Sequence, residues 1–144
     1  MPHRLRYVLD TNMLVAALRS ELGASRQLLL AAFALNFDLL VSVPLMLEYE
    51  AVLTRPDQVA AFRLLRPEVE RFLVAVADLA IPVRLAFRWR PLLPDPADDM
   101  VLETAINGGA TAIVTFDLRH FQTTSTGFRY TAMSPAEALQ RMKR

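Results

Sequence analysis

Apolar residues along the chain fall into short runs, separated by longer stretches in which they recur every three or four positions. The short runs at residues 5–9, 39–43 and 112–116 predict buried strands. Apolar residues that alternate with mostly basic ones at 83–89, and a short run at 129–132, predict two more. The longer stretches predict helices, at residues 13–18, 25–35, 44–53, 98–107, from 135 onward, and as a pair within 56–78.

Strands that alternate with helices in this way are typical of an α/β fold. We therefore predict a single domain over residues 1–144 with a mainly parallel central sheet of about four to five strands and helices on both faces.

Polar residues at the ends of these stretches predict where the helices begin and end. Thr11 and Asn12 can cap the first helix, and Ser25 can cap the second. Ser134-Pro135-Ala136-Glu137 fits a capping box with proline in the first turn. Gly108-Gly109 fits the end of the helix before it.

The composition removes several kinds of site. The 144 residues include no cysteine, which excludes disulfides, thiolate zinc sites, iron–sulfur clusters and cysteine nucleophiles. The single lysine, Lys143, lies in the polar C-terminal tail, which argues against a catalytic lysine in the interior. Neither a P-loop nor a G-x-G-x-x-G motif can be written with the four glycines.

No signal peptide is visible, and the longest apolar run, residues 28–35, is shorter than the ~20 residues that span a bilayer. Together with the missing cysteines, this predicts a cytoplasmic protein with no membrane partner.

Four acidic residues occupy related places in the predicted fold. Asp10 and Asp117 directly follow strands, and Glu48 lies in the helix that begins after a third strand. Asp98 lies in the first turn of the helix at 98–107. Because the carboxyl ends of parallel strands meet at one edge of a sheet, these side chains can converge there.

Each acid also has a purely structural explanation. An aspartate between a strand and a helix often caps the helix, which fits Asp10 and Asp117 taken singly, and Asp95 followed by Pro96 fits another such cap. Helical phase is more informative for Asp98, which falls on the apolar stripe of its helix, whereas Asp99 lies at the margin and Glu103 on the other side.

The helix at 44–53 leaves an alternative open, because Glu48 and Glu50 both flank its apolar arc. Clustered carboxylates repel one another unless a cation compensates their charge. Mg²⁺ or Mn²⁺, which prefer oxygen ligands, suit a set of carboxylates with almost no histidine and no cysteine. Such sites commonly activate water for attack on phosphorus.

Four ordered segments resemble the motifs of PIN-domain nucleases, and they cover nearly the whole chain. Residues 7–12, which read Tyr-Val-Leu-Asp-Thr-Asn, resemble the first motif. Residues 42–56 resemble the second, in the subgroup of toxin components of toxin–antitoxin pairs. Residues 95–99 with Ala105 are similar to the third, and residues 113–121 to the fourth.

The resemblance implies that the following residues are catalytic and hold one or two Mg²⁺ or Mn²⁺ ions: Asp10, Glu48, Asp98 and Asp117. It thereby selects Glu48 over Glu50. Asn12 and Thr115 match positions that support these ligands by hydrogen bonds. The chain departs from the motifs of this family in two places, which leaves the number of metal ions and the identity of one ligand open.

The first departure is His120, which stands where many toxin members have an acid. The second is that Asp95 and Asp99 compete with Asp98 as the third ligand.

The activity that the resemblance implies is metal-dependent hydrolysis of RNA, leaving a 5′-phosphate and a 3′-hydroxyl. It also implies a homodimer that is held inactive by a small antitoxin protein. If four of the 15 acids surround a metal ion, the 16 basic residues dominate the remaining surface, which suits RNA. The arginines within 84–90 either follow a phosphate backbone or are the solvated side of an edge strand.

Two alternatives to this function remain. The first is a PIN scaffold that only binds and does not catalyse. The second is a phosphohydrolase of the haloacid-dehalogenase kind with Asp10 as nucleophile, but that family has a second aspartate where this chain has Asn12, and it also needs an interior lysine.

Overall fold

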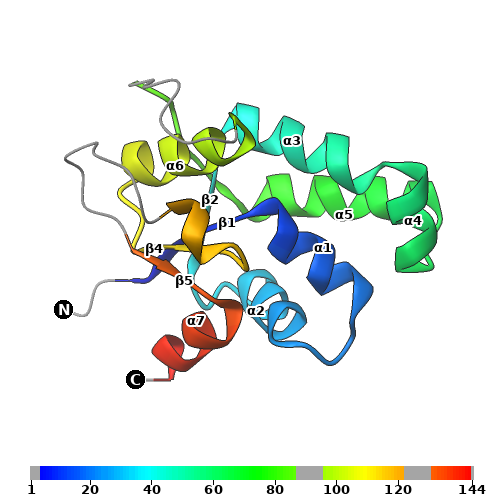
Figure 1. The fold of residues 1–144 in the computed structure, drawn as a ribbon, viewed down its shortest axis with the longest axis horizontal. Helices are drawn as coiled ribbons and strands as arrows, with labels where there is room; N and C mark the ends of the chain where they lie inside the picture. Colours follow the sequence, from blue (N-terminus) through cyan, green and yellow to red (C-terminus); the bar gives the residue numbers. More distant parts are fainter. Residues whose placement is uncertain (1–3, 87–95, 122–130, 144) are drawn as a thin grey trace.

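A five-stranded parallel sheet forms the centre of the molecule, in the order β3-β2-β1-β4-β5 (Figure 1). The computed structural model describes residues 4–86, 96–121 and 131–143. The strands are β1 (Arg6–Leu9), β2 (Asp38–Val41), β3 (Ile81–Pro82), β4 (Ala112–Val114) and β5 (Ala132–Met133). The predicted α/β fold with a parallel sheet is confirmed.

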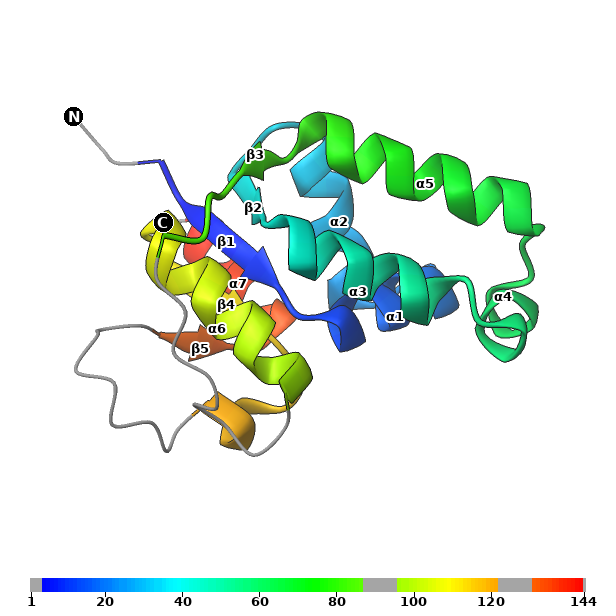
Figure 2. The same ribbon diagram turned by 90° about the horizontal axis from the view of Figure 1, so that it is seen from above.

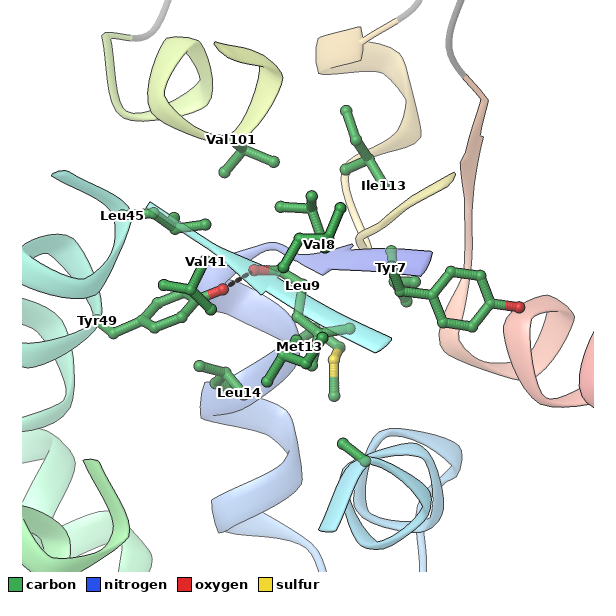
Figure 3. Close-up of a cluster of buried hydrophobic side chains, with 14 of the residues drawn as sticks. Tyr7, Val8, Leu9, Met13, Leu14, Val41, Leu45, Tyr49, Val101 and Ile113 are labelled. Atoms are coloured by element: carbon green, nitrogen blue, oxygen red, sulfur yellow. Dashed lines mark hydrogen bonds between the residues drawn. The ribbon is translucent and has the colours of Figure 1, made fainter. Parts of the chain in front are cut away.

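Helices cover both faces of this sheet (Figures 1 and 3). On one face lies α6 (Pro96–Gly108), and on the other lie α1 (Thr11–Arg19), α2 (Ala24–Phe33) and α7 (Pro135–Met142). The helices α3 (Val43–Leu53) and α5 (Arg66–Leu79) lie side by side and extend away from the sheet toward α4 (Pro56–Phe62) (Figure 2). A 3-10 helix, η1 (Leu118–Phe121), follows β4. No helix in the described ranges is both long enough and apolar enough to cross a bilayer.

The central strand β1 is buried on both sides, as expected for a parallel sheet. Tyr7, Val8 and Leu9 have no exposed surface. The hydroxyl of the fully buried Tyr49 donates a hydrogen bond to the backbone oxygen of Leu9, which fixes α3 against the end of β1 (Figure 3). The residue that follows, Asp10, therefore leaves the sheet from a rigid point.

The helix ends agree with the sequence in part. Ser134 and Glu137 form the predicted capping box at the start of α7. Gly109, with φ at +61°, ends α6 in the left-handed region that favours glycine. The predicted caps Thr11 and Asn12 are wrong, because Asp10 itself caps α1 and both residues belong to the first turn.

Ser25 does not cap α2 either. It lies inside that helix, which begins after Gly23 with no cap from a side chain. The N-cap position of α2 is Gly23. The Ser25 hydroxyl lies two residues further along, inside the helix, and so does not occupy the cap position.

The strand predicted at 83–89 is wrong over its described part. The ladder ends after β3, where the Val83 N–H still donates to the Val41 oxygen at 2.9 Å. From there on, β2 has turned into α3 and offers no further partner. The Ala86 N–H instead donates to the Asn107 side chain on α6. Residues 87–89, like residues 129 and 130 of the last predicted strand, lie outside the described ranges, and β5 occupies Ala132–Met133.

The strand order reverses its direction at β1. The chain passes from β1 outward to β2 and β3, and then returns to place β4 on the other side of β1. At such a reversal, the loops after the two neighbouring strands diverge and leave room for a ligand at their carboxyl ends. Asp10 follows β1 and Asp117 follows β4, so both predicted site residues lie at this reversal.

Candidate active site

Asp10 stands at the start of α1 with 7% of its surface exposed. Its Oδ1 accepts a hydrogen bond from the Thr11 N–H at 2.8 Å, and its Oδ2 accepts one from the Thr115 hydroxyl at 2.7 Å. The structural explanation for Asp10 as a helix cap is therefore correct, but it accounts for only one carboxylate oxygen. The other oxygen is held by a residue after β4.

Thr115 connects the ends of β1 and β4. Its hydroxyl, which is fully buried, donates to Asp10 and accepts hydrogen bonds from the Asp117 N–H at 2.9 Å and from Asn12 Nδ2 at 3.4 Å. One hydroxyl thus fixes the side chain of one carboxylate and the backbone of another. The supporting role of Thr115 stays a prediction, and these hydrogen bonds are the contacts on which it would depend.

Asn12 completes the connection from the α1 side. Its Nδ2 donates to Asp117 Oδ2 at 2.9 Å, and its Oδ1 accepts from the Phe116 N–H at 3.3 Å. Both ends of the amide are therefore used to hold the segment that carries Asp117. The Asp117 carboxylate is itself exposed, so it stays available to a ligand from solvent.

Asp98 reaches the same region from the first turn of α6, with 6% of its surface exposed. Its Oδ2 lies 2.9 Å from Nδ1 of His120 in η1. Asp99 and Glu103 are also buried. Because α6 is enclosed on more than one side, helical phase does not separate Glu103 from Asp98 by exposure, and the contrast expected between them is not seen.

The charges of these carboxylates affect one another. The pKa of Asp10 is raised to about 6. Burial is the largest cause, and the carboxylates of Asp98 and Asp117 raise it further, against the hydrogen bonds from Thr115 and Thr11. The pKa of the Tyr49 hydroxyl is raised well above its usual value by burial and, to a smaller extent, by the charge on Asp10. Three carboxylates from separate elements therefore share one electrostatic environment.

Glu48 is half-buried on α3, next to Tyr49. No described residue shares a hydrogen bond or ion pair with it. Glu50 lies on the opposite flank of the helix, about 200° away, where it lines a groove between α3 and α5 together with Met46 and Thr54. The structure therefore separates two glutamates that the apolar pattern did not, and it places Glu50 in a different surface feature.

The donors fit a hard divalent cation in their chemistry, because they are carboxylate oxygens in a partly dry setting. In residues 4–86, 96–121 and 131–143, however, no three His, Cys, Asp or Glu side chains are grouped closely enough to ligate one ion together. Mg²⁺ usually keeps several water molecules and takes only one or two carboxylates directly, so this spacing is compatible with binding through water. Asp95 lies outside the described residues.

Sequence reasoning missed the contact between His120 and Asp98. The available signal was a histidine in place of an acid in the fourth motif, which indicated that His120 was unusual but not what it contacts.

A family model described as PIN domain matches residues 6–119, which include nearly all the residues discussed above. A search of curated proteins found no match.

Proposed function

The chain belongs to the PIN-domain family, which is a nuclease fold, and we propose that it is a metal-dependent endoribonuclease acting as the toxin of a toxin–antitoxin pair. The observation that carries this proposal is that three carboxylates, from the ends of β1 and β4 and the start of α6, interact electrostatically, with one Thr115 hydroxyl bonded to both Asp10 and the Asp117 backbone. Two of them, Asp98 and Asp117, raise the pKa of the third, Asp10. A cluster of this kind binds a compensating cation when its carboxylates ionise together.

Asp10, Asp98 and Asp117 are the residues that would hold Mg²⁺ or Mn²⁺, with Glu48 as a further ligand or as a group that orients the attacking water. When bound, the divalent ion would activate water and neutralise negative charge on the oxygens of the phosphate group. This chemistry requires no lysine or cysteine, and the interior provides neither.

The remaining residues keep the carboxylates in place. Thr11 and Thr115 hold the two oxygens of Asp10 in one orientation, and Asn12 holds Asp117. Such fixed side chains reduce the reorganisation required when substrate and ion bind. Positive charge for the phosphate backbone would come from the excess of bases outside the acidic cluster, which includes the described Arg84.

The protein partners in this proposal are a small antitoxin and a second copy of the chain. Two apolar grooves support such contacts. One of about 450 Å³ lies between α3 and α5, and one of about 390 Å³ is lined by residues of α1, α2 and α5, where Leu30 and Phe33 are exposed. Light scattering of the purified chain would give its assembly state.

The test is cleavage of a fluorescently labelled RNA by the metal-free chain, with and without added Mg²⁺ or Mn²⁺. We expect cleavage only with metal, products with a 5′-phosphate and a 3′-hydroxyl, and a loss of at least about 100-fold in kcat/KM for Asp10→Asn. Asp78→Asn, at an exposed position on α5, is the matched control.

If Asp10→Asn is folded and cleaves as fast as the wild type, the proposed chemistry is wrong. If calorimetry shows no binding of Mg²⁺ or Mn²⁺ at millimolar concentration, a scaffold that only binds its partners is the better explanation.

A further inference from the structure

The contact between His120 and Asp98 joins two elements that are distant in the sequence. Asp98 lies in the first turn of α6, and His120 lies in η1, just after the strand that leads to Asp117. Nδ1 of the imidazole is 2.9 Å from Asp98 Oδ2. Because an ionised carboxylate only accepts hydrogen bonds, Nδ1 is the donor.

The backbone around His120 is fixed by Asp117 and by its own neighbour. The backbone N–H of His120 donates a hydrogen bond to the backbone oxygen of Asp117 at 3.0 Å. The next residue, Phe121, is buried with 2% of its surface exposed. The imidazole therefore projects from a segment that begins at Asp117 and is anchored in the core. It reaches across to the carboxylate of Asp98, so that the positions of Asp98 and Asp117 depend on each other.

The exposure of the two partners is unequal. The side chain of His120 is 47% exposed, whereas that of Asp98 is 9% exposed. A contact with so much exposure on one side contributes little to folding stability. Its effect falls instead on the orientation of the buried Asp98 carboxylate, whose Oδ2 is held by the imidazole.

We propose that His120 is a positioning residue for the metal site: by donating from Nδ1 to Asp98 Oδ2 it fixes the orientation of that carboxylate relative to Asp117, and a divalent cation would bind the carboxylate in this orientation. This inference rests on the proposed function, because it requires Asp98 to be a ligand. It assigns to His120 a role that an acid in the same position would not have, since a carboxylate cannot donate to Asp98. Hydrogen-bond partners of metal ligands commonly change metal affinity by about 10-fold to 100-fold.

The test is calorimetric titration of the chelator-treated chain with Mn²⁺ alone, in the wild type and four variants. His120→Ala removes the donor. His120→Asn restores a donor one bond from Cγ, where Nδ1 is attached, whereas His120→Gln carries the same amide one bond further out and is the matched control. Asp10→Asn tests the metal site independently of His120.

We expect His120→Ala and His120→Gln to raise the Kd for Mn²⁺ about 10-fold and His120→Asn to restore it to near the wild-type value. The melting temperatures of the three metal-free His120 variants should match that of the wild type, which separates positioning from a general loss of structure.

An unchanged or lower Kd in His120→Ala, with binding lost in Asp10→Asn, would overturn the role of His120 and leave the metal site standing. Unchanged binding in every variant, including Asp10→Asn, would overturn both the proposed site and this inference. If His120→Ala does not fold, the comparison of His120→Asn with His120→Gln decides the question, because equal Kd values in these two would contradict the proposed geometry.

Discussion

The Thr115 hydroxyl donates a hydrogen bond to Asp10 Oδ2 at 2.7 Å, across 105 positions of sequence. The Thr115 hydroxyl oxygen also accepts a hydrogen bond from the Asp117 N–H, so the two aspartates that follow β1 and β4 are fixed through one side chain. Because parallel strands must be brought together by crossover connections, residues so far apart in the chain become neighbours at the end of the sheet.

Thr115→Val therefore tests whether this hydroxyl organises the site. Valine keeps the shape of the side chain but removes all three hydrogen bonds of the hydroxyl, which leaves the Asp117 N–H without this acceptor. We expect a loss of about 1–3 kcal/mol in the free energy of unfolding, measured by urea denaturation, and slower RNA cleavage.

Thr111→Val is the matched control for this change. Thr111 lies just before the other end of β4, where its hydroxyl accepts the Arg6 N–H at 3.0 Å. It should lower stability without slowing cleavage by the folded protein. Equal effects of the two variants on cleavage would show that Thr115 acts only through stability.

The raised pKa of Asp10 predicts how the stability of the metal-free protein depends on pH. The pKa is about 6 in the folded chain, against a reference value of 3.8. Between these values the folded protein holds more protons than the unfolded chain, so stability falls as pH rises through this window and the full cost is present above it. A rise in pKa of this size corresponds to a loss of at most about 3 kcal/mol in the free energy of unfolding.

Asp10→Asn should remove this cost, because asparagine is neutral and caps helices as well as aspartate does. In the presence of a chelator, urea denaturation at pH 7.5 should show the variant to be more stable than the wild type, and the difference should shrink toward pH 4. The exposed Asp78→Asn should show no such gain. A wild type that is most stable above pH 7 without metal would contradict the buried, coupled carboxylate.

The parts of the site that could be predicted from the sequence are those set by local order along the chain. Asp10 comes one residue after β1 and Asp117 three residues after β4, and parallel strands place their carboxyl ends together whatever the rest of the fold does. The contact between His120 and Asp98 could not be predicted in this way, because it depends on how η1 packs against α6. The apolar periodicity of each segment does not indicate that η1 and α6 pack against each other.

The strand predicted at residues 83–89 failed for a related reason. Alternation of apolar and basic residues indicates that one side of a segment faces the core, and Val83 does so without being part of a ladder. A strand also needs a neighbouring strand as hydrogen-bond partner. β2 ends at Val41, and α3 begins two residues later, at Val43. The apolar pattern reports burial, whereas hydrogen-bond partners are set by the rest of the fold.

Glu48 and Glu50 provide a matched pair that tests the choice between them. Glu50 lines the groove between α3 and α5, whereas Glu48 lies on the other flank of α3, beside Tyr49, whose hydroxyl is bound to the end of β1. We expect Glu48→Gln to lower kcat/KM for RNA cleavage by at least about 10-fold, and Glu50→Gln to leave it within about twofold of the wild type. The reverse order would place the second acid of the site at Glu50.

Two neighbouring glycines at the end of α6 should respond differently to alanine. A Cβ on Gly108 would meet Val83 Cγ2 at 2.9 Å and Leu40 Cδ1 at 3.0 Å, so the helix approaches the sheet more closely than any side chain allows. We expect Gly108→Ala to lower the free energy of unfolding by about 1–3 kcal/mol through overpacking.

A Cβ on Gly109 meets nothing within 4 Å, but its φ of +61° costs an alanine about 1 kcal/mol. Gly109→Asn should recover part of that loss because asparagine tolerates this conformation. Urea denaturation of the three variants separates the two causes: if asparagine at position 109 is no better than alanine, backbone conformation is not what requires glycine there.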